Sequence, residues 1–188
     1  MLAGDRFTLD GTVAERASLV ACGQMATPVF AGPSPSQTDA GWHVAHGATL
    51  HVAGEPLLLE PESSHAAGAT FTLEGSGSAL IVDTFGLRGS ARLSMRTRAR
   101  LDGRLVYRDA YDIAGNLAGA FGTVTLVAAG DELRAALAAR AFAVANDVAG
   151  SVRIGVGETA AAAVVRLHGA RVWDVRAAAL AIAGVTSP

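Results

Sequence analysis

The sequence predicts a mainly β protein of many short strands, with two helices near its C-terminal end. Apolar and polar residues alternate with a period of two from the start to about residue 112, which is typical of half-buried strands. The alternating runs are short and closely spaced, and glycine, proline or serine separates them. Beyond residue 112, two Ala- and Arg-containing segments have helical spacing instead.

Short strands are expected at close intervals through the first part of the chain. The predicted strands cover residues 7–13, 18–22, 42–44, 49–52, 57–60, 70–73 and 79–83. Residues 31–36 interrupt them as a loop, because Pro33 and Pro35 lack a backbone N–H and restrict the residues that precede them.

Residues 91–101 form the clearest predicted strand, with arginines on one face and apolar residues on the other. The sequence Asp102-Gly103 suits a type I′ turn, so residues 104–111 should return as the antiparallel partner. A two-residue loop would then place Arg96 opposite Asp109. The arginine row is interpreted as a solvated face, and a docking surface for an acidic partner is the alternative.

The last third of the chain mixes strands and helices. Strands are predicted at residues 121–129, 151–156 and 163–167. Helices are predicted at residues 131–145 and at residues 171–183, where Gly184 ends the second helix. We expect a single domain over residues 1–188, with a strand-rich part (1–129) and a helix-containing part (130–188).

Composition excludes several classes of protein. Hydrophobic residues make up 51% and charged residues 17% of the chain, so it is not intrinsically disordered. The net charge is −2 without a basic tract, which argues against a nucleic-acid partner, and no apolar run is long enough to span a membrane. The single Cys22 and the absence of a signal-peptide pattern predict a cytoplasmic protein. Without lysine, P-loop and Schiff-base chemistry are excluded.

Two motifs invite a functional interpretation. Residues 155–160 match G-x-G-x-x-A with Asp174 downstream, but too little chain follows for a dinucleotide-binding domain, so an ordinary strand and turn is preferred. A second segment is rich in histidine and glutamate: His43, His46, His51, His65, Glu55, Glu60 and Glu62. Its spacing fits no fixed metal site, so scattered surface histidines are preferred and transient metal handling stays open. Nothing brings a nucleophile to a base, so catalysis has no positive support.

Several segments carry a resemblance in their order and spacing. They are residues 1–9 (MLAGDRFTL), 24–30 (QMATPVF), 42–56, 83–89 (DTFGLRG), 102–109 and 164–167 (VVRL). Five of them resemble, in order, the Gly-Gly-Asp-x-Leu, Gln-Ala-Ala/Ser-Thr-Lys-Val-Tyr, Gly-Ala-x-Leu, Glu/Asp-x-x-x-x-Gly-Arg and Val-Arg-x-Leu segments of the urease accessory proteins of the UreD/UreH family. The match continues through residues 102–109, which lie before the last of these segments. The chain resembles a short member of this family that begins close to the Gly-Gly-Asp segment.

The resemblance implies a flattened, β-helix-like superstructure and a non-enzymatic role. Proteins of this family bridge apo-urease to the UreF and UreG accessory proteins and are thought to conduct nickel through an internal passage, so nickel would be cargo in transit and no cofactor would bind tightly. By position in the matched segments, the passage-lining candidates are Asp5, Thr27, Asp83 and Asp109.

Each candidate also has a purely structural interpretation. Asp5 would cap a turn, Thr27 would precede a bend, and Asp83 would bond backbone N–H groups. Asp109 would pair with Arg96 across the hairpin. The alternative functions are a freestanding β domain that binds a carbohydrate or small ligand, and an unrecognised hydrolase.

Overall fold

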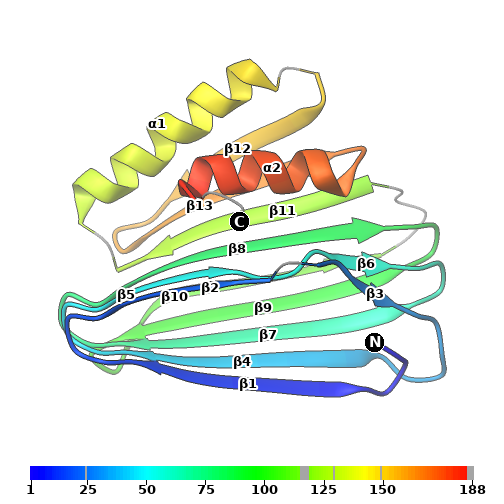
Figure 1. Ribbon diagram of the computed structural model, residues 1–188, viewed down its shortest axis with the longest axis horizontal. Helices are drawn as coiled ribbons and strands as arrows, with labels where there is room; N and C mark the ends of the chain where they lie inside the picture. The colour runs from blue at the N-terminus through cyan, green and yellow to red at the C-terminus, as the bar shows by residue number, and fades with distance from the viewer. Residues whose placement is uncertain (24, 115–118, 129, 149, 186–188) are drawn as a thin grey trace.

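The computed structural model describes residues 1–23, 25–114, 119–128, 130–148 and 150–185. Within this part of the chain, strands predominate and two helices come late, as predicted (Figure 1). The strands are β1 Arg6–Val13, β2 Ser18–Cys22, β3 Thr27–Val29, β4 Ser36–Val44, β5 Thr49–Ala53, β6 Leu57–Leu59, β7 Ser64–Leu73, β8 Ser78–Leu87, β9 Arg92–Leu101, β10 Arg104–Ile113, β11 Gly119–Val127, β12 Val152–Glu158 and β13 Ala162–Gly169. The helices are α1 Asp131–Asp147 and α2 Val172–Ala183.

The predicted boundaries are close to those observed. Helix α1 ends two residues beyond the predicted 145, and Gly184, in the left-handed conformation at φ 69°, ends α2 as predicted. The strand predicted at residues 121–129 corresponds to β11. Residue 129, the last of the predicted strand, lies outside the described residues. Residues 155–158 continue strand β12, so the G-x-G-x-x-A match opens no helix.

Two sheets form a flattened β-solenoid of about 3 turns, which confirms the β-helix-like expectation. One sheet has the order β1-β4-β7-β9-β10, and the other has the order β12-β13-β11-β8-β5-β2, to which β6 and β3 are added. Strands β1, β4, β7 and β9 pair in parallel, as do β2, β5 and β8, because the chain returns to each sheet one turn later. The later strands β10, β11, β12 and β13 pair antiparallel.

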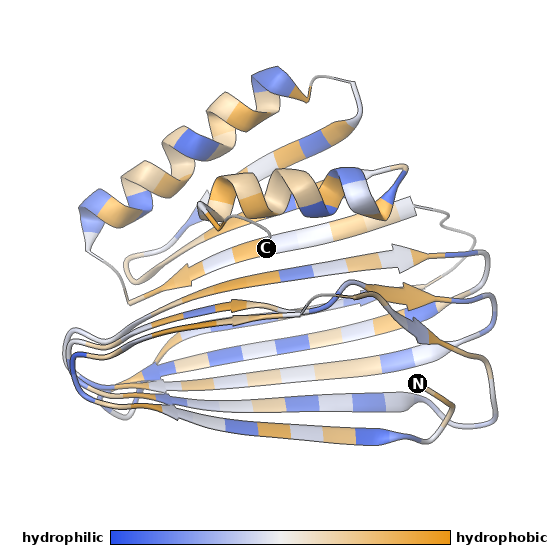
Figure 2. Cartoon of the chain, viewed as in Figure 1, coloured by the Kyte–Doolittle hydropathy of each residue, from blue (hydrophilic) through white to orange (hydrophobic). Residues whose placement is uncertain are grey.

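Apolar side chains fill the space between the sheets in two clusters. The first inner cluster includes Trp42, Phe71, Leu73, Ile81 and Ala99. The second inner cluster includes Val29, Leu59, Phe85, Leu93 and Met95. Strand β9 contributes to both because every second residue points inward, and its alternation is visible in Figure 2.

The helices cover the other face of the eight-stranded sheet. Val175, Ala179 and Ile182 of α2 are fully buried there together with Leu137 of α1 and residues of β8, β11 and β13. Neither α1 nor α2, the helices of the described part of the chain, lies on the outer face of the five-stranded sheet (Figure 1).

The hairpin at residues 101–104 confirms the turn prediction and corrects the predicted pairing of Arg96. Asp102 and Gly103 have positive φ (48° and 79°) and Leu101 faces Arg104, as a two-residue type I′ loop requires. A β-bulge between Leu105 and Tyr107 then shifts the register by one residue, so Arg96 faces Ala110 and not Asp109. Because strand faces alternate, the same shift turns Asp109 into the interior.

Arg96 therefore pairs with a different carboxylate. It donates to both oxygens of Asp112, at 3.1 and 3.0 Å, on the exposed face of the hairpin. The predicted arginine face is confirmed: the arginines at 92, 96, 98 and 100 are all exposed.

A contact between β1 and β4 yields the first testable prediction. The indole ring of Trp42 lies over Gly11 on the neighbouring strand, and a Cβ built at Gly11 would collide with it. We expect Gly11→Ala to lower the free energy of unfolding by about 1–3 kcal/mol, because the ring must move out of a packed cluster. Gly155→Ala on β12 is the matched control, since a Cβ there meets nothing within 4 Å. Equal denaturation midpoints for the two variants would contradict the prediction.

Candidate functional site

A belt of polar side chains crosses the interior between the two inner clusters. On the eight-stranded sheet, Asp83 lies beside Thr123 in the register, and Thr123 lies beside Arg166. On the five-stranded sheet, Asp109 lies beside Thr97. We call these five residues the polar belt.

The flanking residues show that the belt faces inward. Three belt residues each lie between two inward-facing residues of the same strand, one two positions before and one two positions after. One of these neighbours belongs to the first inner cluster or packs against it, and the other belongs to the second inner cluster or packs against it. These neighbours are Ile81 and Phe85 for Asp83, Ala99 and Met95 for Thr97, and Tyr107 and Tyr111 for Asp109. The belt is therefore a polar section through an apolar interior.

One ion pair connects the two sheets across the belt. Arg166 Nη2 on β13 donates to both carboxylate oxygens of Asp109 on β10, at 2.8 Å each. The Tyr107 hydroxyl donates to Asp109 Oδ2 at 3.2 Å, and the Arg166 guanidinium lies 5.2 Å from the ring centre of Tyr111. Burial, followed by the negative charge of Asp109, raises the pKa of Tyr107 to about 12, so this hydroxyl keeps its proton at neutral pH.

Asp83 is a belt carboxylate whose titration is altered by its surroundings. Burial raises the pKa of Asp83 to about 6, although Arg176 of α2 and a side-chain hydrogen bond with Thr123 act in the opposite direction. A carboxyl with this pKa changes charge close to neutral pH. Asp83 can therefore take up and release a proton with a small change in pH near neutrality.

Two hollows open on either side of Arg166. One has a volume of about 440 Å³ and reaches Tyr107, Asp109 and Glu158. The other, of about 220 Å³, reaches Tyr111 and Thr123. The belt is thus accessible from the side on which β10 and β12 form the sheet edges.

The other two predicted residues lie outside the belt. Asp5 Oδ2 accepts a hydrogen bond from the Leu2 N–H at 2.7 Å, in the turn before β1. The Thr27 hydroxyl donates to Glu55 at the start of β3. The segment before β1 also lies against β3, since the N-terminal ammonium donates to the Pro28 carbonyl oxygen at 2.8 Å.

The histidine-rich segment is dispersed by the fold. His43 Nε2 lies 2.9 Å from Glu74 Oε1, and His65 Nδ1 lies 2.9 Å from Ser36 Oγ in the interior. Burial lowers the pKa of His65 to about 4 and, together with Arg140, lowers the pKa of His51. Among the described residues, no three His, Cys, Asp or Glu side chains gather closely enough to hold a metal ion.

The comparison with protein families assigns the chain to a family. The family model described as UreD urease accessory protein matches residues 1–188, the whole chain. The chain belongs to the UreD urease accessory protein family. A search of curated proteins gave no match.

UreD proteins are accessory proteins, so the family assignment favours a role in urease maturation over the carbohydrate-binding and hydrolase alternatives. Neither helix in the described part of the chain has the length and apolar character needed to cross a bilayer.

Sequence reasoning missed most of the belt. Arg166, Thr123 and Thr97 were not recognised as neighbours of the predicted aspartates. One usable signal was present: in Tyr107-x-Asp109-x-Tyr111 a carboxylate shares a strand face with two aromatic residues, which marks an inward-facing acid. The partner Arg166 is 57 residues away from Asp109, and no local pattern connects them.

Proposed function

We propose that this chain is a non-catalytic scaffold for urease maturation, which binds apo-urease and UreF-like and UreG-like accessory proteins in the cytoplasm. In this proposal, nickel passes through the polar belt on its way to the urease active site. The observation that supports it is a row of charged and hydroxyl side chains crossing the interior of a UreD family member, where an apolar row would suffice for folding.

The chemistry of the belt suits an ion in transit. Nickel binds oxygen and imidazole ligands, and a site with few ligands releases the ion readily. Asp83 is the principal candidate, because its raised pKa allows a proton to displace the cation near neutral pH. Asp109 shares its charge with Arg166, so it contributes orientation and less attraction for the ion.

Asp5 and Thr27 are proposed to lie near a second opening of the passage. Both belong to the side of the molecule where β1 and β3 lie, away from the β10 and β12 edges. Thr27 and its partner Glu55 together offer two oxygen groups at that side.

The test is maturation of urease in cells that express the chain with apo-urease and the other accessory proteins. We expect Asp83→Asn to preserve co-purification of the complex while lowering the nickel content and activity of the urease several-fold, because a neutral amide attracts the cation less. Glu132→Gln, which changes an exposed carboxylate on α1, is the control and should behave as wild type.

The outcomes separate the two parts of the proposal. Normal nickel loading with Asp83→Asn would contradict the role of the belt. A wild-type chain that fails to co-purify with apo-urease or any accessory protein would contradict the scaffold itself.

A further inference from the structure

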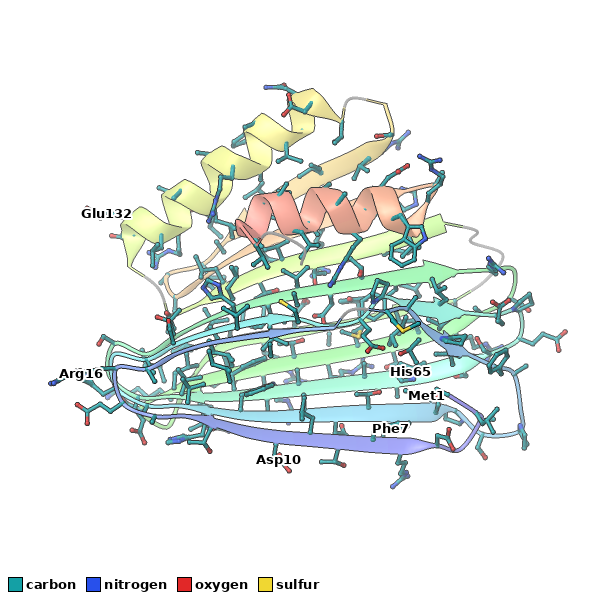
Figure 3. All side chains as sticks on the ribbon, in the orientation of Figure 1. Met1, Phe7, Asp10, Arg16, His65 and Glu132 are labelled. Carbon is teal, nitrogen blue, oxygen red and sulfur yellow. The ribbon has the colours of Figure 1, made fainter. Side chains whose placement is uncertain are left out.

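The outer face of the five-stranded sheet is a flat polar surface that no described helix or strand covers. Four of its strands are parallel and in register, so their outward residues form straight rows across the sheet. Figure 3 shows Asp10 on this face, pointing away from the body of the protein. We call this surface the outer face.

Charges on the outer face are sorted by strand. Asp10 of β1 and Asp39 of β4 lie on one half, together with Arg6 at the start of β1. The other half, on β9 and β10, carries exposed arginines at 92, 96, 98, 100 and 108, with Asp112 beside Arg96. Between the halves, β7 presents only small residues: Ala66, Gly68, Thr70 and Thr72.

One contact in the arginine half is unfavourable for an isolated chain. Arg98 and Arg108 face each other directly across β9 and β10, and like charges in that position are destabilising. Such an arrangement is stabilised when negative charge from another surface lies against it.

We propose that the outer face binds a second copy of this chain, with a two-fold axis running along β7. Rotation about this axis lays β1 of one copy over β10 of the other and β4 over β9, with β7 over β7. The acidic half of each copy then covers the arginine half of its partner, and the small residues of β7 meet at the centre. An interface of this kind is self-complementary, as two-fold symmetry requires.

The register of the sheet specifies the pairs. Three rows run across the strands from β1 to β10, and each carries opposite charges at symmetry-related positions. The resulting contacts, each formed twice, are Arg6 with Asp112, Asp39 with Arg96, and Asp10 with Arg108 of the other copy. A two-fold axis across the strands would instead place acids against acids, so the charges select the axis along β7.

Glycines let the acidic side chains lie low on the surface. A Cβ at Gly41 would collide with the Asp10 carboxylate, and a Cβ at Gly68 would lie 2.6 Å from Asp39 Oδ1. Both carboxylates therefore extend over the neighbouring strand toward β7. A hollow of about 200 Å³ lies between Asp39, Arg96 and Arg98 and gives room for side chains of the second copy.

The outer face is large enough for a stable dimer. Five strands spaced about 4.8 Å apart, with about eight residues each at 3.3 Å, give about 600 Å² on each copy. The two copies together would bury about 1,200 Å², which reaches the lower end of the range for specific interfaces.

The test uses charge reversal and the full chain purified alone. Sedimentation at low salt should show a dimer, and Asp10→Arg or Arg108→Asp alone should raise the dissociation constant by about tenfold or more, because each creates two like-charge contacts. Mixing the two variants should restore the wild-type constant, since the heterodimer places the new arginine against the new aspartate. Within one copy, Arg108→Asp removes the repulsive contact between Arg98 and Arg108. The substitution therefore relieves strain in the fold, and a loss of dimerisation by this variant cannot be attributed to unfolding.

Two further variants complete the test. Thr70→Arg places bulk and charge on the axis and should abolish the dimer in any mixture. Arg153→Asp, on β12 and away from the outer face, should leave the dimer unchanged. A wild-type chain that stays monomeric at about 0.5 mM and low salt would overturn the proposal, even if the arginines then bound an acidic peptide. A dimer that is insensitive to the charge reversals would also overturn it.

Discussion

Replacing Arg166 with methionine is expected to lower the free energy of unfolding by about 1–3 kcal/mol, because it leaves a mostly buried carboxylate without its main donor. The Asp109 side chain is 18% exposed, and its two oxygens receive Arg166 Nη2 and the Tyr107 hydroxyl. Without Arg166, the Tyr107 hydroxyl and the Ala110 backbone N–H remain as neutral donors. Arg166 itself is 51% exposed, so solvent moderates the loss and the upper values known for fully buried pairs do not apply.

A double-mutant cycle with Asp109→Asn measures the pair directly. We expect a coupling energy of about 1 kcal/mol or more from urea denaturation, because the two side chains connect separate sheets. Arg153→Met, an exposed arginine on the adjacent strand β12, is the control and should change stability by less than about 0.5 kcal/mol. If Arg166→Met and Arg153→Met have the same denaturation midpoint, the inter-sheet pair contributes nothing to stability.

The pairing of Asp109 also shows what the sequence could and could not predict. The turn at Asp102-Gly103 was predictable, because a type I′ turn needs two residues that tolerate positive φ. The bulge between Leu105 and Tyr107 was not, since the residues there form an ordinary alternating strand in sequence. That bulge determines whether the Asp109 side chain faces the interior or the solvent. The predicted pairing with Arg96 therefore placed Asp109 on the wrong face of the sheet.

The same reasoning explains the success with the fold class. Alternation, short strands and turn residues are local properties, and together they predicted β structure followed by two helices. Parallel stacking of β1, β4 and β7 depends on contacts between residues about one solenoid turn apart, which local patterns do not encode. The flattened β-helix was therefore expected from the family resemblance and not from periodicity.

The interior location of His65 and Asp83 leads to the second large effect, an opposing pH dependence of stability. The pKa of His65 is lowered to about 4 by burial, whereas the unfolded chain has the ordinary value of 6.5. As the pH falls from 6.5 to 4, the unfolded chain takes up a proton that the folded protein does not, so stability is lost. The pKa of Asp83 is raised from 3.8 to about 6, so over this acidic range the folded protein takes up its proton first and gains stability.

Because the two contributions oppose each other, single variants are needed to observe them. The pKa shift of each group corresponds to a change of up to about 3 kcal/mol in the free energy of unfolding. Partial exposure of Asp83 reduces its contribution to about 1–2 kcal/mol. His65→Gln should remove the loss of stability that His65 causes, so that the free energy of unfolding rises as the pH falls from 6 to 4. Asp83→Asn should be more stable than wild type at pH 7 and lose that advantage on acidification.

The measurement is urea denaturation at half-unit steps from pH 4 to pH 7.5, with His43→Gln as the control, since His43 is partly exposed beside Glu74. The unfolding free energy of wild type minus that of His65→Gln should fall steadily from pH 7 to pH 4, whatever constant cost the substitution adds. Parallel pH profiles for these two proteins would show that His65 is protonated as readily in the fold as in the unfolded chain. The hydrogen bonds from Ser36 and Thr38 would then have to hold an imidazolium, which contradicts a neutral ring in the interior.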